Sequence, residues 1–224
     1  MARTKLCDRE LPPYTRGEEI FNMVSHIVGG GFAVIALVLC VLLPALKSNT
    51  AGVLCGAVFG ISLVTLYTIS GIYHGLKGCT TAKKVMQVID HCAIFLLIAG
   101  TYTPITLLAV AKVSPTAAWI IFGIVWACAA LGITLNAIDL KKYRVFSMIT
   151  YIGMGWCISA ALRPFAASVE PGAVWLLVAG GISYTAGAVF YSFGKKKRYM
   201  HSIFHLFVLA GSILHFFSIA LYIL

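Results

Sequence analysis

Charged side chains are scarce in this 224-residue chain, and acidic ones are the scarcest. Only 11% of the residues are charged, 17 of them Lys or Arg and 7 Asp or Glu, whereas a soluble domain has about 25%. Hydrophobic residues make up 60% of the chain, against about 45–50% in such domains. These proportions exclude a soluble globule, a disordered chain and, despite the net charge of +10, a nucleic-acid-binding domain.

Paired cysteines and a secretion signal are missing as well. The seven cysteines form no CxxC pair and their number is odd, which argues against a disulfide framework. The first 21 residues hold four basic and four acidic side chains and lack the apolar centre of a signal peptide. The cysteines, expected to be small packing residues, are Cys7, Cys40, Cys55, Cys79, Cys92, Cys128 and Cys157.

The chain consists mainly of seven apolar stretches separated by short polar breaks. They cover approximately residues 23–46, 52–76, 84–110, 116–138, 145–163, 173–192 and 200–224. Each can cross a hydrocarbon layer of about 30 Å as a helix rising about 1.5 Å per residue. Pro104 predicts a kink in the third stretch, and a threonine of Thr80-Thr81 is expected to cap it. The sequence thus predicts an all-α membrane protein, a bundle of seven transmembrane helices over 23–224 behind an N-terminal tail of residues 1–22.

Basic residues divide unevenly between the two ends of these helices. Fourteen of the 17 fall in the tail and in the second, fourth and sixth breaks. Because cytoplasmic loops carry the excess of Lys and Arg, we predict a cytoplasmic N-terminus, an external C-terminus and a location in the cell membrane. The fourteen are Arg3, Lys5, Arg9, Arg16, Lys77, Lys83, Lys84, Lys141, Lys142, Arg144, Lys195, Lys196, Lys197 and Arg198.

Small residues recur every fourth position at the start of the second helix. Gly52, Gly56 and Gly60 form a row along which another helix can approach closely. Packing within one chain is the favoured interpretation, ahead of a dimer contact, and the oligomeric state stays open.

Ionisable side chains inside a transmembrane helix are costly and are therefore candidates for function. His201 and His205 lie four residues apart on one face of the last helix, separated by about 6 Å of rise. This spacing lets two imidazoles converge on one metal ion. Ser212 and His215 fall on nearly the same face, so the helix carries a polar stripe that should face the bundle interior.

The second and third helices supply matching groups. Ser70 and His74 are also four residues apart, with Tyr67 on the same side. The predicted topology places His74, Asp90 and the histidine pair of the last helix at one depth near the cytoplasmic face. Of the seven acidic residues, we expect only Asp90 to lie within a helix beside this group.

Further polar residues are weaker candidates. Glu18, Asn22 and His26 lie on one side of the first helix near its cytoplasmic start. His91 points about 100° away from Asp90. His215 lies about 15 Å beyond the histidine pair. For these three additional histidines, a hydrogen bond that packs helices is the favoured interpretation.

Three histidine nitrogens suit Zn²⁺ and leave a fourth position for water or substrate. Zinc would lower the pKa of that water towards neutrality. Asp90 could hold or deprotonate the water, or serve as a fourth ligand. Ser70, one turn from His74, could hydrogen-bond the water or a polarised carbonyl.

At these residues the chain resembles the hemolysin III family, the bacterial branch of the progestin and adipoQ receptor group, within a superfamily that includes alkaline ceramidases. The resemblance extends over nearly the whole chain. Its carriers are Glu18-Glu19, Asn22 and Ser25-His26; Ser70 and His74; Asp90-His91 leading to the run from Leu96 to Pro104; and His201 with His205.

The resemblance implies seven helices with the N-terminus inside and a zinc ion near the cytoplasmic face. His74, His201 and His205 would be its ligands, Asp90 the partner of the water and Ser70 a supporting group. It does not settle the activity, because the group includes proteins called hemolysins, receptors and lipid-amide hydrolases.

Two functions compete, and two others are less favoured. The first is a zinc-dependent hydrolase of a membrane lipid amide or ester, with Asp90 as general base and Ser70 stabilising the oxyanion. The second is a non-enzymatic sensor or homeostasis protein with structural zinc. A cytolysin is disfavoured because the chain looks permanently inserted, and a transporter because paired half-repeats with broken helices are missing.

Overall fold

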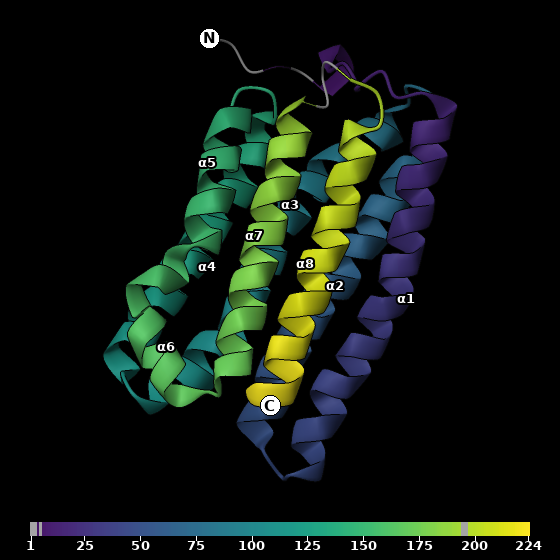
Figure 1. Cartoon of the computed structure of the whole chain (residues 1–224). Coiled ribbons are helices and arrows are strands. Elements are labelled where there is room, and N and C mark those ends of the chain that lie inside the picture. Colours follow the sequence, from purple (N-terminus) through teal and green to yellow (C-terminus); the bar gives the residue numbers. More distant parts are fainter. Residues whose placement is uncertain (1–3, 5, 194–196) are drawn as a thin grey trace.

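The structure, a computed structural model, describes residues 4, 6–193 and 197–224 and is helical with no strand over these ranges (Figure 1). The long helices are α1 (Arg16–Leu46), α2 (Thr50–Gly75), α3 (Thr81–Pro104), α4 (Pro115–Asp139), α5 (Arg144–Gly155), α6 (Leu162–Ser168), α7 (Pro171–Phe193) and α8 (Met200–Tyr222). Short helices are η1 (Leu6–Asp8), η2 (Ile105–Ala109), η3 (Val110–Lys112) and η4 (Cys157–Ala161). Four of the counted basic residues, Arg3, Lys5, Lys195 and Lys196, lie outside the described residues.

The first helix begins at Arg16 rather than near residue 23. Thr15 and Glu18 form a reciprocal capping box, in which the Thr15 side chain accepts from the Glu18 N–H and Glu18 accepts from the Thr15 N–H. This cap adds two helical turns before the apolar stretch, and those turns carry both glutamates of the first span. Thr80 caps α3 by accepting from the Lys83 N–H, which confirms the expected threonine cap.

The third and fifth spans depart from regular α-helix. As expected, α3 stops at Pro104 and continues as the π turn η2 and the 3-10 turn η3. The fifth span, predicted as one helix over 145–163, is α5, η4 and α6. At this break the Tyr102 hydroxyl donates to the Gly155 carbonyl at 2.8 Å and accepts from the Ile158 N–H at 2.9 Å. A polar side chain from α3 thus satisfies backbone groups that the break frees, as an apolar medium requires.

The glycine row packs α2 against α1. A Cβ at Gly56 would lie 2.0 Å from the carbonyl oxygen of Cys40, and one at Gly60 would lie 2.6 Å from the Cα of Leu37. The contact is within the chain, which confirms the favoured interpretation of the row. It seats the long first helix tightly against the second and so sets the position of its polar start.

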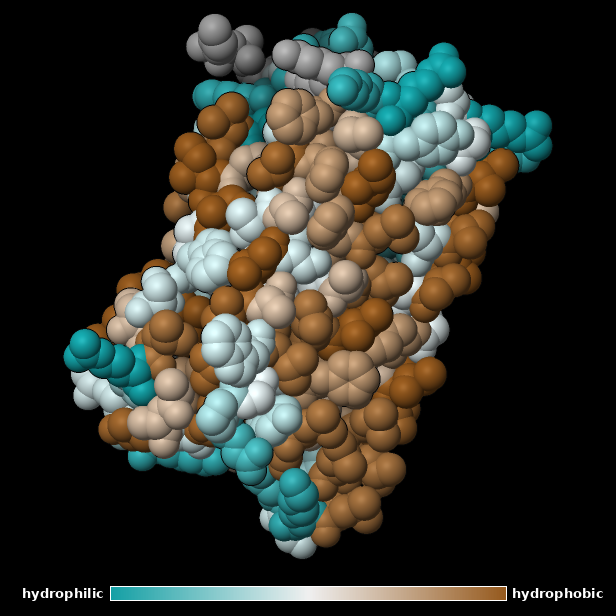
Figure 2. Space-filling model, viewed as in Figure 1, coloured by the Kyte–Doolittle hydropathy of each residue, from teal (hydrophilic) through white to brown (hydrophobic). Residues whose placement is uncertain are grey.

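The surface is that of a membrane protein. Figure 2 shows a brown apolar band over the middle of the bundle and teal hydrophilic residues gathered at its two ends. Within the described residues, seven helical segments are long and apolar enough to span a membrane, which makes the chain a multi-pass membrane protein. The start of α1 and the start of α8 lie at one end, and the C-terminus lies towards the other (Figure 1). That the first of these ends faces the cytoplasm stays a prediction.

Gly56→Ala tests the close contact of α1 and α2. We expect it to lower the thermal unfolding midpoint, because the added methyl group meets backbone, and overpacking typically costs about 1–3 kcal/mol. Gly31→Ala is the matched control, since a Cβ there meets nothing within 4 Å. Equal midpoints for the two variants in detergent would contradict the assigned contact.

Thiol labelling tests the predicted orientation. Cys79 is exposed in the break before α3, at the predicted cytoplasmic end. In a Cys7→Ser background, we expect a membrane-impermeant maleimide to label Cys79 only after the cells are permeabilised. A Lys112→Cys variant, with its thiol at the opposite end, should label in intact cells. The reverse pattern would mean that the orientation is wrong.

Candidate metal centre

Three histidines from two helices converge at the predicted cytoplasmic end. His74 is on the last turn of α2, and His201 and His205 are on the first turns of α8. All three are buried, and one ligand atom of each lies within 4.8 Å of the others. The ring centroid of His74 is 5.4 Å from that of His201 and 5.0 Å from that of His205. The structure therefore brings together the three residues that spacing and depth predicted.

The ring nitrogens of this cluster lie close enough together for one cation to bind them. Nε2 of His201 and Nε2 of His205 face each other at 2.9 Å. Nε2 of His74 is buried and has no hydrogen-bond partner. Two ring nitrogens at this distance share either one proton or one cation, and zinc–nitrogen bonds of about 2.0–2.1 Å need nitrogens only slightly farther apart. The three histidine ligands and the unpaired Nε2 of His74 fit a zinc ion.

Glu19 of α1 holds the other nitrogen of His74. Nδ1 of His74 lies 2.6 Å from Oε2 of Glu19, and Oε1 of the same carboxylate accepts from Nζ of Lys83 at 2.6 Å. The expectation that Asp90 alone among the acidic residues lies beside the group is therefore wrong. Glu19 reaches His74 because α1 begins at Arg16, and the Thr15 and Glu18 pair was the sequence signal for that earlier start.

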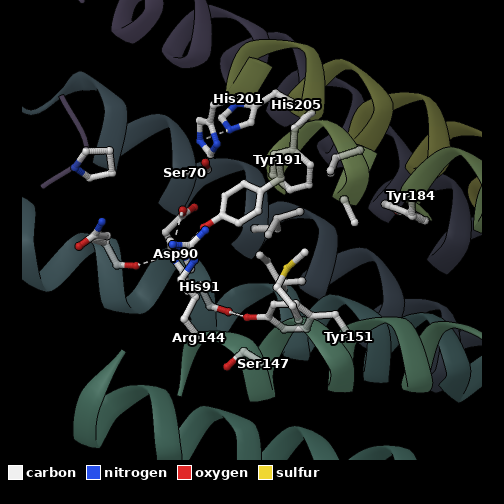
Figure 3. A pocket seen from close by; sticks show the side chains of 18 of the residues that line it. Ser70, Asp90, His91, Arg144, Ser147, Tyr151, Tyr184, Tyr191, His201 and His205 are labelled. Carbon is white, nitrogen blue, oxygen red and sulfur yellow. Dashed lines mark hydrogen bonds and ion pairs between the residues drawn. The ribbon is translucent and has the colours of Figure 1, made fainter. Parts of the chain in front are cut away.

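Asp90 and Ser70 line a cavity next to the histidines. The cavity has a volume of about 750 Å³ and runs from the N-terminal segment into the bundle between α3, α5, α7 and α8. Figure 3 shows Ser70, Asp90, His201 and His205 around this space, with Tyr191 of α7 on its wall. Among the described residues, the group of closely spaced ligand atoms does not include Asp90. Oδ2 of Asp90 lies 3.8 Å from Nδ1 of His91. This placement favours a role on a water or a substrate over direct metal binding.

The accessory histidines differ in whether their ring nitrogens have hydrogen-bond partners. His215 makes the expected packing bond, with Nε2 3.0 Å from the Leu177 carbonyl. His91 contacts the Gln87 carbonyl through Nδ1 at 2.8 Å and the Tyr191 hydroxyl through Nε2 at 3.4 Å. His26 differs from the expectation, because neither of its ring nitrogens has a hydrogen-bond partner.

Instead, His26 packs against the histidine cluster. Its ring lies edge-on to that of His205, with centroids 4.1 Å apart, and 5.3 Å from the ring of Tyr67. Asn22, one turn earlier on α1, accepts from the Ser202 hydroxyl at 2.7 Å. The Tyr67 hydroxyl donates to the hydroxyl of Ser212 at 2.8 Å. These groups therefore position α1 and α2 against α8.

The N-terminal segment covers the cluster from the end of the bundle. The Tyr14 ring stacks on that of His201, with centroids 4.9 Å apart and planes at 19°. Burial raises the pKa of the Tyr14 phenol, so the group is neutral. The Thr4 N–H donates to Asp139 of α4 at 2.8 Å, which ties the segment across the opening. Tyr14 could not be predicted from the sequence, because nothing local marks a tail residue that folds back onto a helix.

Comparison with known proteins gives the family of the chain. A model of the family described as "Haemolysin-III related" matches residues 14–216. "Hemolysin-3" of Bacillus cereus is 34% identical over 207 residues, covering 92% of each chain. "Hemolysin-3 homolog" of Bacillus subtilis (strain 168) is 35% identical over 93% of this chain and 96% of its own. The human "Monocyte to macrophage differentiation factor" is 26% identical over 74% of this chain and 69% of its own. With seven apolar helices and the expected residues in place, the chain belongs to the haemolysin-III family.

Proposed function

We propose that this protein is a zinc-dependent hydrolase of a membrane lipid amide or ester, in the plasma membrane and acting near its cytoplasmic face. The observation that carries the proposal is a cluster of three buried imidazoles, two of which line a cavity together with a carboxylate and a hydroxyl. A wholly structural cluster would not need such a cavity.

His74, His201 and His205 would hold the zinc ion. When bound, zinc supplies a Lewis acid and lowers the pKa of a coordinated water towards neutrality. Asp90 would take a proton from the attacking water as general base. The Ser70 hydroxyl, buried one turn below His74, would donate a hydrogen bond to the oxygen that gains charge on the substrate carbonyl.

The rest of the cavity suits an acyl chain. Apolar side chains from α2, α3, α5, α7 and α8 line its walls, among them Leu66, Ile94, Leu97 and Val208. The polar groups of the site gather towards one end, so an amphiphilic lipid would place its scissile carbonyl there and its chain in the bundle. Tyr14 would limit the entry of bulk water from the end of the bundle.

Zinc content and hydrolysis test the proposal together. We expect purified protein to bind about one zinc ion per chain by elemental analysis, and His205→Ala to lose it, because one of three ligands is gone. Asp90→Asn should keep the zinc and lower kcat against lipid amides and esters by about 10²–10⁴-fold, the usual contribution of a general base.

Glu170→Gln is the matched control, because the same change of carboxylate to amide is made at an exposed position far along the chain. It should keep both zinc and rate. Zinc-loaded wild type that turns over no faster than His205→Ala would contradict the hydrolase.

A structural role for zinc in a receptor-like protein is the second candidate. The cluster joins α2 to α8, two helices that are far apart along the chain. The relative named "Monocyte to macrophage differentiation factor" carries no enzyme name. In this case chelation should lower the thermal midpoint of the wild type, since metal binding adds to the free energy of unfolding, while the wild type shows no turnover. A zinc-free protein with an unchanged midpoint would contradict this role.

A further inference from the structure

We infer that Glu19 and Lys83 are positioning residues that fix the tautomer of His74 and strengthen its bond to a metal ion. The inference rests on the proposed three-histidine zinc site and concerns a carboxylate and an ammonium group that neither bind the metal nor touch the substrate. It is carried by the two short contacts of the Glu19 carboxylate, one to His74 and one to Lys83.

The chemistry of the His74 contact determines where its proton lies. An ionised carboxylate only accepts hydrogen bonds. At 2.6 Å, Nδ1 of His74 must therefore carry a proton and donate a hydrogen bond to Oε2 of Glu19. In a neutral imidazole the lone pair is then on Nε2. That nitrogen is buried and without a hydrogen-bond partner, which is what a ligand atom needs.

Lys83 keeps the carboxylate ionised and in place. Its ammonium group donates to Oε1 of Glu19 at 2.6 Å and to the carbonyl of Leu76, which ends α2, at 2.7 Å. Lys83 is itself buried, and its ammonium group lies 5.4 Å from the centroid of the Tyr73 ring. The chain of contacts therefore runs from α3 through α1 to the last turn of α2.

His74 is singled out by this support. Among the described residues, the ion pairs of histidine involve His74 and His91 only, so His201 and His205 have no carboxylate at ion-pair distance. A carboxylate that holds a ligating histidine fixes its ring and raises its basicity, and losing such a partner typically weakens metal affinity about 10–100-fold. His74, the single ligand from α2, is thus the ligand that contacts a carboxylate.

Zinc affinity by competition with a chromophoric chelator tests the inference on the full-length protein in detergent. We expect Glu19→Ala to bind zinc about 10–100-fold more weakly than wild type. Glu19→Gln should lose less, because its amide oxygen still accepts from Nδ1 but carries no charge. Glu170→Gln, the same change at an exposed site, should bind as wild type does.

The tautomer itself is the readout that a merely structural role would not move. In zinc-free protein labelled with ¹⁵N-histidine, NMR should show the signal of an Nδ1-protonated imidazole that disappears in His74→Ala. It is distinct from the signal of His91, whose Nδ1 donates to the Gln87 carbonyl. In Glu19→Ala the His74 signal should shift towards the Nε2-protonated form. If Glu19→Ala does not fold, Glu19→Gln at wild-type zinc affinity overturns the inference.

The outcomes separate the two proposals. Wild type that binds no zinc contradicts the proposed function. Wild type that binds zinc, with Glu19→Ala within twofold of it or with an unchanged His74 tautomer, leaves the zinc site standing and overturns the role of Glu19 and Lys83.

Discussion

Burying polar side chains in an apolar bundle is costly unless each finds a partner, and the rest of this structure depends on how that cost is offset. No water is available in the hydrocarbon layer to satisfy an imidazole, a carboxylate or a broken helix. The chain meets the constraint by drawing such groups together. Tyr102 satisfies the backbone at the break after α5, and Ser212 joins the hydroxyls of Tyr67 and Tyr184. At the histidine cluster several buried ring nitrogens have no hydrogen-bond partner, Nε2 of His74 among them, and this exception locates the candidate chemistry.

The scaffold around the cluster is built from tight contacts at its far side. The glycine row of α2 lets α1 approach until a methyl group would not fit. Because α1 is then fixed along its length, the polar residues of its first turns are held against the ends of α2 and α8. Asn22 meets Ser202, His26 meets His205, and Glu19 meets His74. Apolar packing in one half of the membrane thus supports polar geometry in the other.

Most of the fold could be predicted from the sequence, because the apolar stretches and their capping residues are local signals. The convergence of His74 with His201 and His205 could also be predicted, since helical spacing gives the face and the alternation of spans gives the depth. The long-range contacts could not. The first helix begins before the apolar stretch, because hydropathy marks the residues that can lie in lipid, whereas the capping box marks the start of the helix. The contact between Glu19 and His74 could not be predicted, because Glu19 precedes the apolar stretch, and no local signal marks Lys83 as more than a topological charge.

The N-terminal segment adds a consequence for kinetics. Tyr14 lies flat on the ring of His201, and the segment that carries it is tied to α4 through Asp139. The ring therefore covers one face of His201 at this end of the bundle. For a zinc ion bound as proposed, the rate of exchange would therefore depend on a tail outside the helices, whereas the affinity would depend on side chains within them.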